Sequence, residues 1–216
     1  GTILTDLSFN VTGHSNLAAL AIIDAGSNNV SEVTNVTANT SFSSLNAGNG
    51  LTAPDDGAES FDVYATFNST VTDNEQIQLT ISSATEDGAN GSAFSAVDAG
   101  GASTNISGDD NRIEVSATEL QFDQGPSNVQ INSAMNPALT VQCVDVNGNL
   151  DLDNSANITI SSTGSLDATA STNPVNAVNG VATFNNLIHD ASGTGLTLSA
   201  NATGLSATGN SVAFDV

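Results

Sequence analysis

The sequence predicts an all-β fold made of two tandem antiparallel β-sandwich domains. The first observation behind this prediction is that apolar and polar residues alternate in short runs, which puts one face of each run in a core and the other in water. The second is that clusters of Gly, Asn and Ser, which favour turns, separate these runs. The third is the scarcity of strong helix formers, since the 216 residues include a single basic side chain and one Met.

The first half of the chain contains three runs with clear alternation, at residues 3–11, 61–67 and 77–81. Shorter apolar runs lie between and after them. Residues 16–23 have the spacing closest to that of an amphipathic helix, but this segment fits a strand equally well. The expected strands of the first half are, in chain order, 3–11, 18–24, 30–36, 40–45, 61–67, 77–81 and 112–115.

The second half repeats this pattern of short strands and turns. Its turn-rich clusters lie at 146–149, 178–180 and 191–195. A domain boundary is expected near 115–118, which gives a module at 1–116 and a second at 117–216, joined by a few residues at most. A link this short favours a stiff array of domains. The expected strands of the second half are 120–122, 139–144, 158–160, 181–184, 196–200 and 212–216.

Several segments of the second half match, in order, the elements of a known repeat. Residues 117–122 match an opening strand, 139–149 a hairpin of the form V-x-V-x-D-x-N-G-N, and 179–187 a strand of the form N-G-V-A-T-F-x-x-L. The Pro turn at 125–126 and the closing pair, 195–200 with 211–216, complete the series. Residues 117–216 therefore resemble the bacterial immunoglobulin-like repeat of large secreted surface adhesins, of the Bacteroidota type.

The resemblance has one departure, because Leu196 follows Gly195 where the repeat often has an aromatic residue. Residues 1–116 resemble, more loosely, an unnamed accessory β-sandwich module that precedes such repeats. The resemblance implies two immunoglobulin-like sandwiches, secretion to the cell surface, and a role in structural spacing or adhesion. It carries no catalytic residues to transfer.

The charge of the chain excludes two classes of partner. The net charge is -22, and Arg112 is the only Lys or Arg residue. Such a surface repels nucleic acid and anionic lipid headgroups, because it offers almost nothing to pair with a phosphate. No apolar run approaches the length of a membrane span, so no membrane insertion is expected. No signal peptide is recognised, and the chain is expected to be a processed mature protein or a fragment.

Catalytic chemistry finds no recognisable setting in the sequence. His14 and His189 are expected in solvated turns, and neither stands beside a nucleophile motif. Cys143 alternates in step with two apolar residues and is interpreted as a small buried hydrophobe. The chain has no Trp, Tyr64 is its only Tyr, and its eight Phe residues fall on apolar faces and are expected in the core. We therefore predict that the chain is not an enzyme.

Calcium is the best metal candidate, because it takes oxygen ligands from Asp, Asn and carbonyl groups in loops. The position of Gly148 and the absence of a Glu at 156 depart from the usual calcium-binding loop, and a simple hairpin turn is the alternative. A chain this acidic also produces such clusters by chance. The candidate ligands are Asp145, Asn147, Asn149 and Asp151, with Asp153 next to them, and Asp109, Asp110 and Asn111 near the domain junction.

The function predicted from these observations is that of a non-catalytic extracellular structural or adhesive surface protein, either a stalk segment or a filament-forming subunit. The alternative is a glycan-binding ancillary module of a secreted enzyme or adhesin. The expected partners are neighbouring modules or copies of the chain, joined by strand addition through 3–11 or 212–216. Alternatively, both terminal strands pair within their own domains.

The sequence also contains nine N-x-S/T motifs, and Asn10, Asn35, Asn68 and Asn157 are among their asparagines. A chain so rich in Asn, Ser and Thr produces most of them by chance, and in a bacterial protein such motifs usually have no meaning.

Overall fold

The computed structural model describes residues 1–47, 51–54, 57–87 and 111–216. Among these residues the structure is almost entirely β, with one short 3-10 turn, η1 (His14–Asn16), and no α-helix. The predicted all-β, antiparallel sandwich fold is confirmed. No helix in the described residues is long and apolar enough to cross a membrane.

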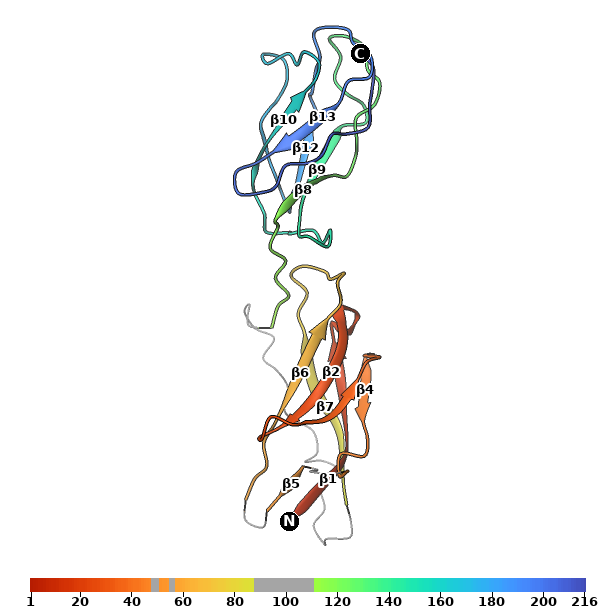
Figure 1. Ribbon diagram of the computed structural model, residues 1–216, viewed down its shortest axis with the longest axis vertical. Helices are drawn as coiled ribbons and strands as arrows, with labels where there is room; N and C mark the ends of the chain where they lie inside the picture. The colour runs from red at the N-terminus through yellow and green to blue at the C-terminus, as the bar shows by residue number, and fades with distance from the viewer. Residues whose placement is uncertain (48–50, 55–56, 88–110) are drawn as a thin grey trace. The chain divides into compact units, whose positions relative to one another are not determined.

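The chain divides into two compact units, coloured red to yellow and green to blue in Figure 1. Unit 1 consists of Gly1–Val71 and Glu75–Ile113, and unit 2 consists of Thr72–Asn74 and Glu114–Val216. The break between Ile113 and Glu114 lies close to the predicted boundary at 116. That 1–116 and 117–216 are separate domains stays a prediction.

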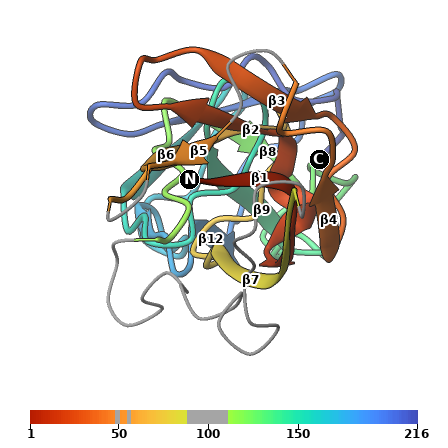
Figure 2. The same cartoon turned by 90° about the horizontal axis from the view of Figure 1, so that it is seen from below.

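The described residues of unit 1 form two antiparallel sheets. In one of them β1 pairs with β4 and β5 on one side and with β7 on the other, and in the second β2 lies between β3 and β6. Figure 2 shows the β2, β3 and β6 layer on one side and β1, β4 and β7 on the other. The strands are β1 (Thr2–Thr12), β2 (Leu17–Asp24), β3 (Asn29–Val33), β4 (Asn39–Phe42), β5 (Thr52–Ala53), β6 (Phe61–Phe67) and β7 (Gln78–Glu86).

The core of unit 1 lies between these two sheets. The alternation in β1 buries Leu7 and Phe9, and β2 contributes Leu20 and Ile22, which are fully buried. Phe42 of β4 meets Phe9 edge to face, with the ring centroids 6.1 Å apart, a favoured geometry for aromatic pairs. The period-two pattern of the sequence therefore becomes the inner face of a sandwich.

The N-terminal strand is an interior strand of its sheet, paired within unit 1 as the second of the two alternatives for 3–11 predicts. Leu7 stands opposite Phe42 on one side and opposite Ala84 on the other. Since its backbone groups are used on both sides, strand addition through β1 needs one neighbour to be displaced first.

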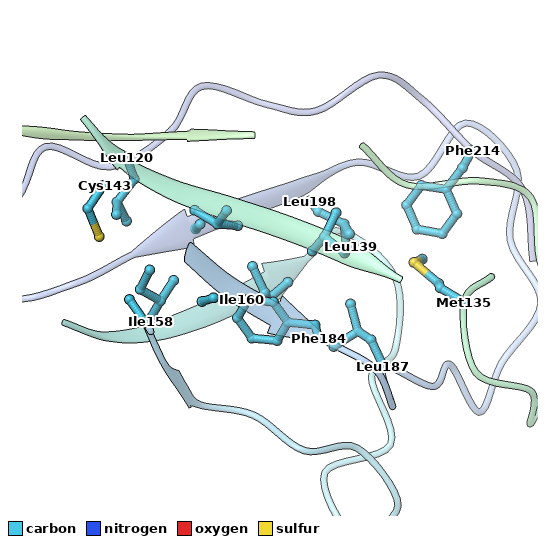
Figure 3. Close-up of a cluster of buried hydrophobic side chains, with 14 residues drawn as sticks. Leu120, Met135, Leu139, Cys143, Ile158, Ile160, Phe184, Leu187, Leu198 and Phe214 are labelled. Carbon is cyan, nitrogen blue, oxygen red and sulfur yellow. The ribbon is translucent and has the colours of Figure 1, made fainter. Parts of the chain in front are cut away.

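Unit 2 also has two antiparallel sheets, with β9 between β8 and β12 and with β10 between β11 and β13. Figure 3 shows side chains from both sheets pointing toward one another in its core, among them Leu139, Ile160 and Phe184. The strands are β8 (Glu119–Phe122), β9 (Leu139–Val144), β10 (Asn157–Ser162), β11 (Val175–Asn176), β12 (Val181–Phe184) and β13 (Leu198–Asn201).

The C-terminal segment is held on two sides within unit 2, although it forms no extended strand. Phe214 and Leu196 exchange backbone hydrogen bonds of 2.8 and 2.9 Å. Asp215 accepts a backbone hydrogen bond from Val129 on the other side. The predicted strand 212–216 is thus reduced to bridge-like pairing, and it too is engaged inside its own unit.

The single cysteine lies in the core of unit 2. Cys143 is fully buried on β9, as predicted for a small hydrophobe. Burial, with a smaller contribution from the charge of Asp151, raises the pKa of its thiol to about 11. A buried, protonated thiol is a poor nucleophile, so its reaction with a thiol reagent reports the unfolding of unit 2.

Candidate functional site

The acidic loop after β9 is organised around the carboxylate of Asp145. Its Oδ1 accepts backbone hydrogen bonds from Asn147 at 2.8 Å and Asn149 at 2.9 Å, and its Oδ2 accepts one from the side chain of Asn149 at 2.9 Å. Partial burial opposes ionisation, but the hydrogen bonds from Asn149 and Asn147 outweigh it and lower the pKa of the Asp145 carboxyl. This carboxylate therefore fixes the turn at Gly148, whose positive φ of 83° suits glycine.

Asp151 has a similar role just beyond that turn. Its Oδ2 accepts a hydrogen bond from the backbone N–H of Ala117 at 2.9 Å, and its Oδ1 accepts one from Asp153 at 3.2 Å. The side-chain amide of Asn154 also donates to Oδ2. Asp151 is 7% exposed, so its charge is stabilised mainly by these donors.

Sequence reasoning missed a third carboxylate of unit 2, that of Asp73. It is 4% exposed. Its Oδ1 accepts the backbone N–H of Val115 at 2.8 Å, and its Oδ2 accepts that of Leu152 at 2.7 Å. No local motif marks Asp73, because its partners lie far along the chain.

The structure brings only some of the predicted calcium ligands together. Asp145, Asn147, Asn149 and Asp151 belong to one loop of unit 2. Asn111 belongs to unit 1, where its carbonyl accepts a hydrogen bond from Ile77. Asp109 and Asp110 lie outside the described residues. In the described ranges no group of three or more His, Cys, Asp or Glu side chains is placed to hold a metal ion.

Calcium binding at the 145–151 loop stays a prediction, with a direct test. If calcium binds the folded loop, a concentration 100 times Kd stabilises the unit by about 2.7 kcal/mol. EDTA should then lower the Tm by several degrees, and added Ca²⁺ should restore it while Mg²⁺ should not. An unchanged Tm after chelation contradicts the prediction and leaves the loop held by its own hydrogen bonds.

The expectation that His189 is a solvated turn residue is wrong. Its side chain is fully buried, with Nε2 2.9 Å from the Ser162 hydroxyl and its ring 5.3 Å from that of Phe214. Its Nδ1 has no hydrogen-bond partner among the described residues. Burial lowers the pKa of the imidazolium, and the nearby charge of Asp190 only partly opposes this effect.

We expect unit 2 to lose stability as the pH falls below about 6.5, the ordinary pKa of histidine. The unfolded chain then takes up a proton that the buried imidazole resists, so the free energy of unfolding falls by up to about 1.4 kcal/mol per pH unit until the lowered pKa of His189 is reached. Urea unfolding at pH 7.5, 6.5 and 5.5 measures this slope.

Two single variants assign that slope. His189→Gln removes it, whereas His14→Gln leaves His189 as the only histidine and keeps it. A slope that survives in His189→Gln contradicts the assignment to this buried ring.

The outer face of β6 carries the most exposed aromatic ring of the described residues. Tyr64 is 60% exposed and stands in register with Ala21 of β2, which in turn stands opposite Glu32 of β3. Phe67, which we expected in the core, is 51% exposed. It occupies the last position of β6, beyond a register shift in the pairing with β2.

Each unit has a hollow on its described surface. The hollow of unit 1 is mostly apolar, and its described lining residues include the polar Thr2 and one titratable side chain, that of Glu59. The hollow of unit 2 is lined by Asn and Thr side chains of β10, of the last residue of β13 and of the segment that follows it, and by two alanines.

No family model matches this sequence, and no curated protein matches it. Among solved structures, the chain is similar to a β-glycosidase from Bacteroides vulgatus, with 10% identity and a TM-score of 0.37 over 93% of this chain and 21% of that one. It is also similar to a glycosyl hydrolase family 2 member from Bacteroides cellulosilyticus, with 13% identity and a TM-score of 0.36 over 92% of this chain and 22% of that one.

A third similar structure is the Parabacteroides merdae β-glucuronidase, with 14% identity and a TM-score of 0.34 over 93% of this chain and 24% of that one. The chain thus spans about a fifth to a quarter of the length of these proteins. Identities and TM-scores of this size do not establish a shared function. The resemblance to adhesin repeats is not confirmed by these comparisons.

Proposed function

We propose that this chain is a non-catalytic segment of an extracellular surface protein, serving as a stalk segment or filament-forming subunit. The observation that carries the proposal is the use made of its buried polar side chains. Asp73, Asp145 and Asp151 hold backbone N–H groups of loops, and His189 packs inside a core. These groups stabilise unit 2, which suits a protein whose task is mechanical.

The surface supports the same proposal. With a net charge of -22 and one basic residue, copies of the chain repel one another unless a specific contact joins them. Assembly with neighbouring modules or with other copies is therefore proposed to use directed strand pairing. Because β1 is already paired on both sides, such pairing proceeds by exchange of a strand.

Fractionation and electron microscopy of the native material test this role. We expect the protein in the cell-surface fraction, as rods or filaments in negative stain. Recovery of dispersed single particles from the cytoplasm contradicts both the localisation and the structural role.

A second candidate function, glycan binding, is favoured by the exposed ring of Tyr64. An exposed ring offers an apolar face to a sugar, and Asp62 and Glu32 are exposed carboxylates on the two neighbours of β2 that accept hydrogen bonds from hydroxyl groups. The small side chain of Ala21 stands between the ring and Glu32 in the register.

A panel of immobilised neutral oligosaccharides tests this second function. Tyr64→Ala is expected to abolish retention, whereas Tyr64→Phe keeps the ring and is expected to preserve most of it. Equal retention of both variants, or no retention of the wild-type chain, contradicts glycan binding at this face.

A further inference from the structure

Two of the N-x-T motifs meet on the outer surface of unit 2. Asn157-Ile158-Thr159 opens β10, and Asn201-Ala202-Thr203 begins at the last residue of β13. The two strands are antiparallel neighbours, and Thr159 stands directly opposite Asn201. The register thus places together two motifs that are far apart in the sequence.

The alternation of both strands turns these motifs outward. Ile158 of β10 and Ala200 of β13 are fully buried. Successive side chains of a strand point to opposite faces, so the neighbouring residues Asn157, Thr159 and Asn201 face solvent. Both asparagines and both threonines of the motifs are exposed. All four side chains line the hollow of unit 2, together with Ala156 and Ala202.

The other motifs in the described residues also present exposed asparagines, but in different settings. Asn10 lies in the interior of three strands, opposite Asn39 on one side and Thr80 on the other. The amide of Asn68 donates to the carbonyl of Ser15 at 2.9 Å. The Asn157 and Asn201 pair is distinguished by its place at strand ends and by its shared hollow. Seven asparagines of N-x-S/T motifs lie in the described residues and are exposed, namely Asn10, Asn29, Asn35, Asn39, Asn68, Asn157 and Asn201. The other two, Asn90 and Asn105, lie outside the described residues.

We infer that this hollow is a glycan attachment site, with Asn157 and Asn201 as the acceptors of N-linked carbohydrate. The N-x-S/T motif is the acceptor pattern of N-glycosylation and requires a surface position in an exported protein. The inference rests on the export proposed above. The donor is an oligosaccharide linked through phosphate to a polyprenyl lipid, and a membrane transferase supplies the base.

The chemical step balances on the asparagine amide. A bond forms between Nδ2 and the anomeric carbon of the sugar, and the bond from that carbon to the phosphate oxygen breaks. The lipid phosphate leaves with the electron pair, and the amide proton passes to the base of the transferase. An asparagine amide carries two N–H groups, so Asn157 keeps one for its hydrogen bond to the Oδ1 of Asn176.

Mass spectrometry of the full chain, purified from the organism that makes it, tests the site. Trypsin has a single cleavage residue, Arg112, so cleavage before Asp residues is used for peptide mapping. The expected result is a hexose- or hexosamine-containing mass on the peptides that carry Asn157 and Asn201.

Two pairs of variants produced in the same organism assign the modification to the motifs. Thr159→Ala and Thr203→Ala are expected to lose the added mass at the asparagine of their own motif, whereas Thr159→Ser and Thr203→Ser keep the motif and the mass. Ser161→Ala, an exposed change outside any motif on the same strand, is expected to change nothing. Unchanged thermal unfolding shows that each variant is folded.

Three outcomes overturn the inference. The first is a native protein whose two peptides have only their polypeptide masses. The second is an added mass that persists in Thr159→Ala and Thr203→Ala, which indicates attachment elsewhere. The third is an added mass on other asparagines only. Unmodified protein recovered from the cell surface contradicts the glycan site alone, whereas protein recovered only from the cytoplasm contradicts the export on which it rests.

Discussion

Replacing Gly180 by Ala is expected to destabilise unit 2 by about 3–4 kcal/mol, because the new methyl group has no room. A Cβ built at this position lies 2.2 Å from the backbone oxygen of Asp151 and 2.9 Å from Cδ1 of Leu150. The φ of Gly180 is also positive, at 75°, which costs an alanine about 1 kcal/mol or more. The backbone must move, since a carbonyl oxygen cannot rotate away as a flexible side chain can.

The position cannot relax without breaking neighbouring hydrogen bonds. The carbonyl of Gly180 accepts a hydrogen bond from the N–H of Cys143 at 2.8 Å. The N–H of Gly180 donates a hydrogen bond to the carbonyl of Asn154 at 3.1 Å. Gly180 thus ties the tight turn before β12 to β9 and to the acidic loop. A shift large enough to admit a methyl group weakens both hydrogen bonds.

Gly204→Ala is the matched control for this prediction. Its φ is 83°, yet no atom lies within 4 Å of the Cβ position, so it is expected to cost only the backbone strain of about 1 kcal/mol. The labelling rate of Cys143 across a urea series reports the free energy of unfolding of unit 2 for each variant. Equal losses for the two variants mean that the close approach to Asp151 is not what limits position 180.

Much of this architecture could be predicted from the sequence, because strand patterning is local. In β9 the alternation of Leu139, Val141 and Cys143 predicts the buried face, and all three are fully buried. The Asn179-Gly180 pair predicts a two-residue turn, and both residues have the positive φ that such a turn needs. The two-residue strands β5 and β11 were missed, because two residues cannot show a period.

Features that depend on residues far apart in the chain could not be predicted. His189 resembles a loop residue because Asp190 and a Gly-rich stretch follow it, but Ser162 and Phe214 enclose its ring. Phe67 continues the alternation of Phe61 and Val63, yet it is exposed at the end of β6. Such contacts can be predicted only when the strand register is known.

The calcium prediction shows the same limit within the candidate site. Alternating Asp and Asn residues from 145 to 153 indicate a cluster of oxygen atoms, and the structure does place several of them in one loop. The sequence cannot show that backbone N–H groups of the same unit already contact the oxygens of Asp145 and Asp151. The donors are main-chain groups, which any residue carries, so no side-chain pattern reveals them.

Replacing Asp73 by Ala is expected to destabilise unit 2 by about 3 kcal/mol. The change removes the acceptor of two backbone N–H groups, those of Val115 and Leu152. Each hydrogen bond to a charged acceptor contributes about 1.5–3 kcal/mol to stability. When a buried N–H donor is left without an acceptor, this contribution is lost in full, because water does not replace the bond. Because Asp73 is only 4% exposed, water reaches these donors poorly.

Asp73→Asn and Asp153→Ala separate the causes of this loss. The amide introduced by Asp73→Asn keeps one oxygen acceptor but turns its NH₂ group toward the second N–H, so this variant is expected to cost about 2 kcal/mol. Asp153 is an exposed carboxylate that accepts a hydrogen bond from the side chain of Asn74 at 3.1 Å, and Asp153→Ala is expected to cost below about 1 kcal/mol. The labelling rate of Cys143 across a urea series measures the free energy of unfolding of unit 2 for all three variants. If Asp73→Ala and Asp153→Ala lose equal stability, acidic charge in this region of unit 2 matters more than the two backbone hydrogen bonds, and the role assigned to Asp73 is wrong.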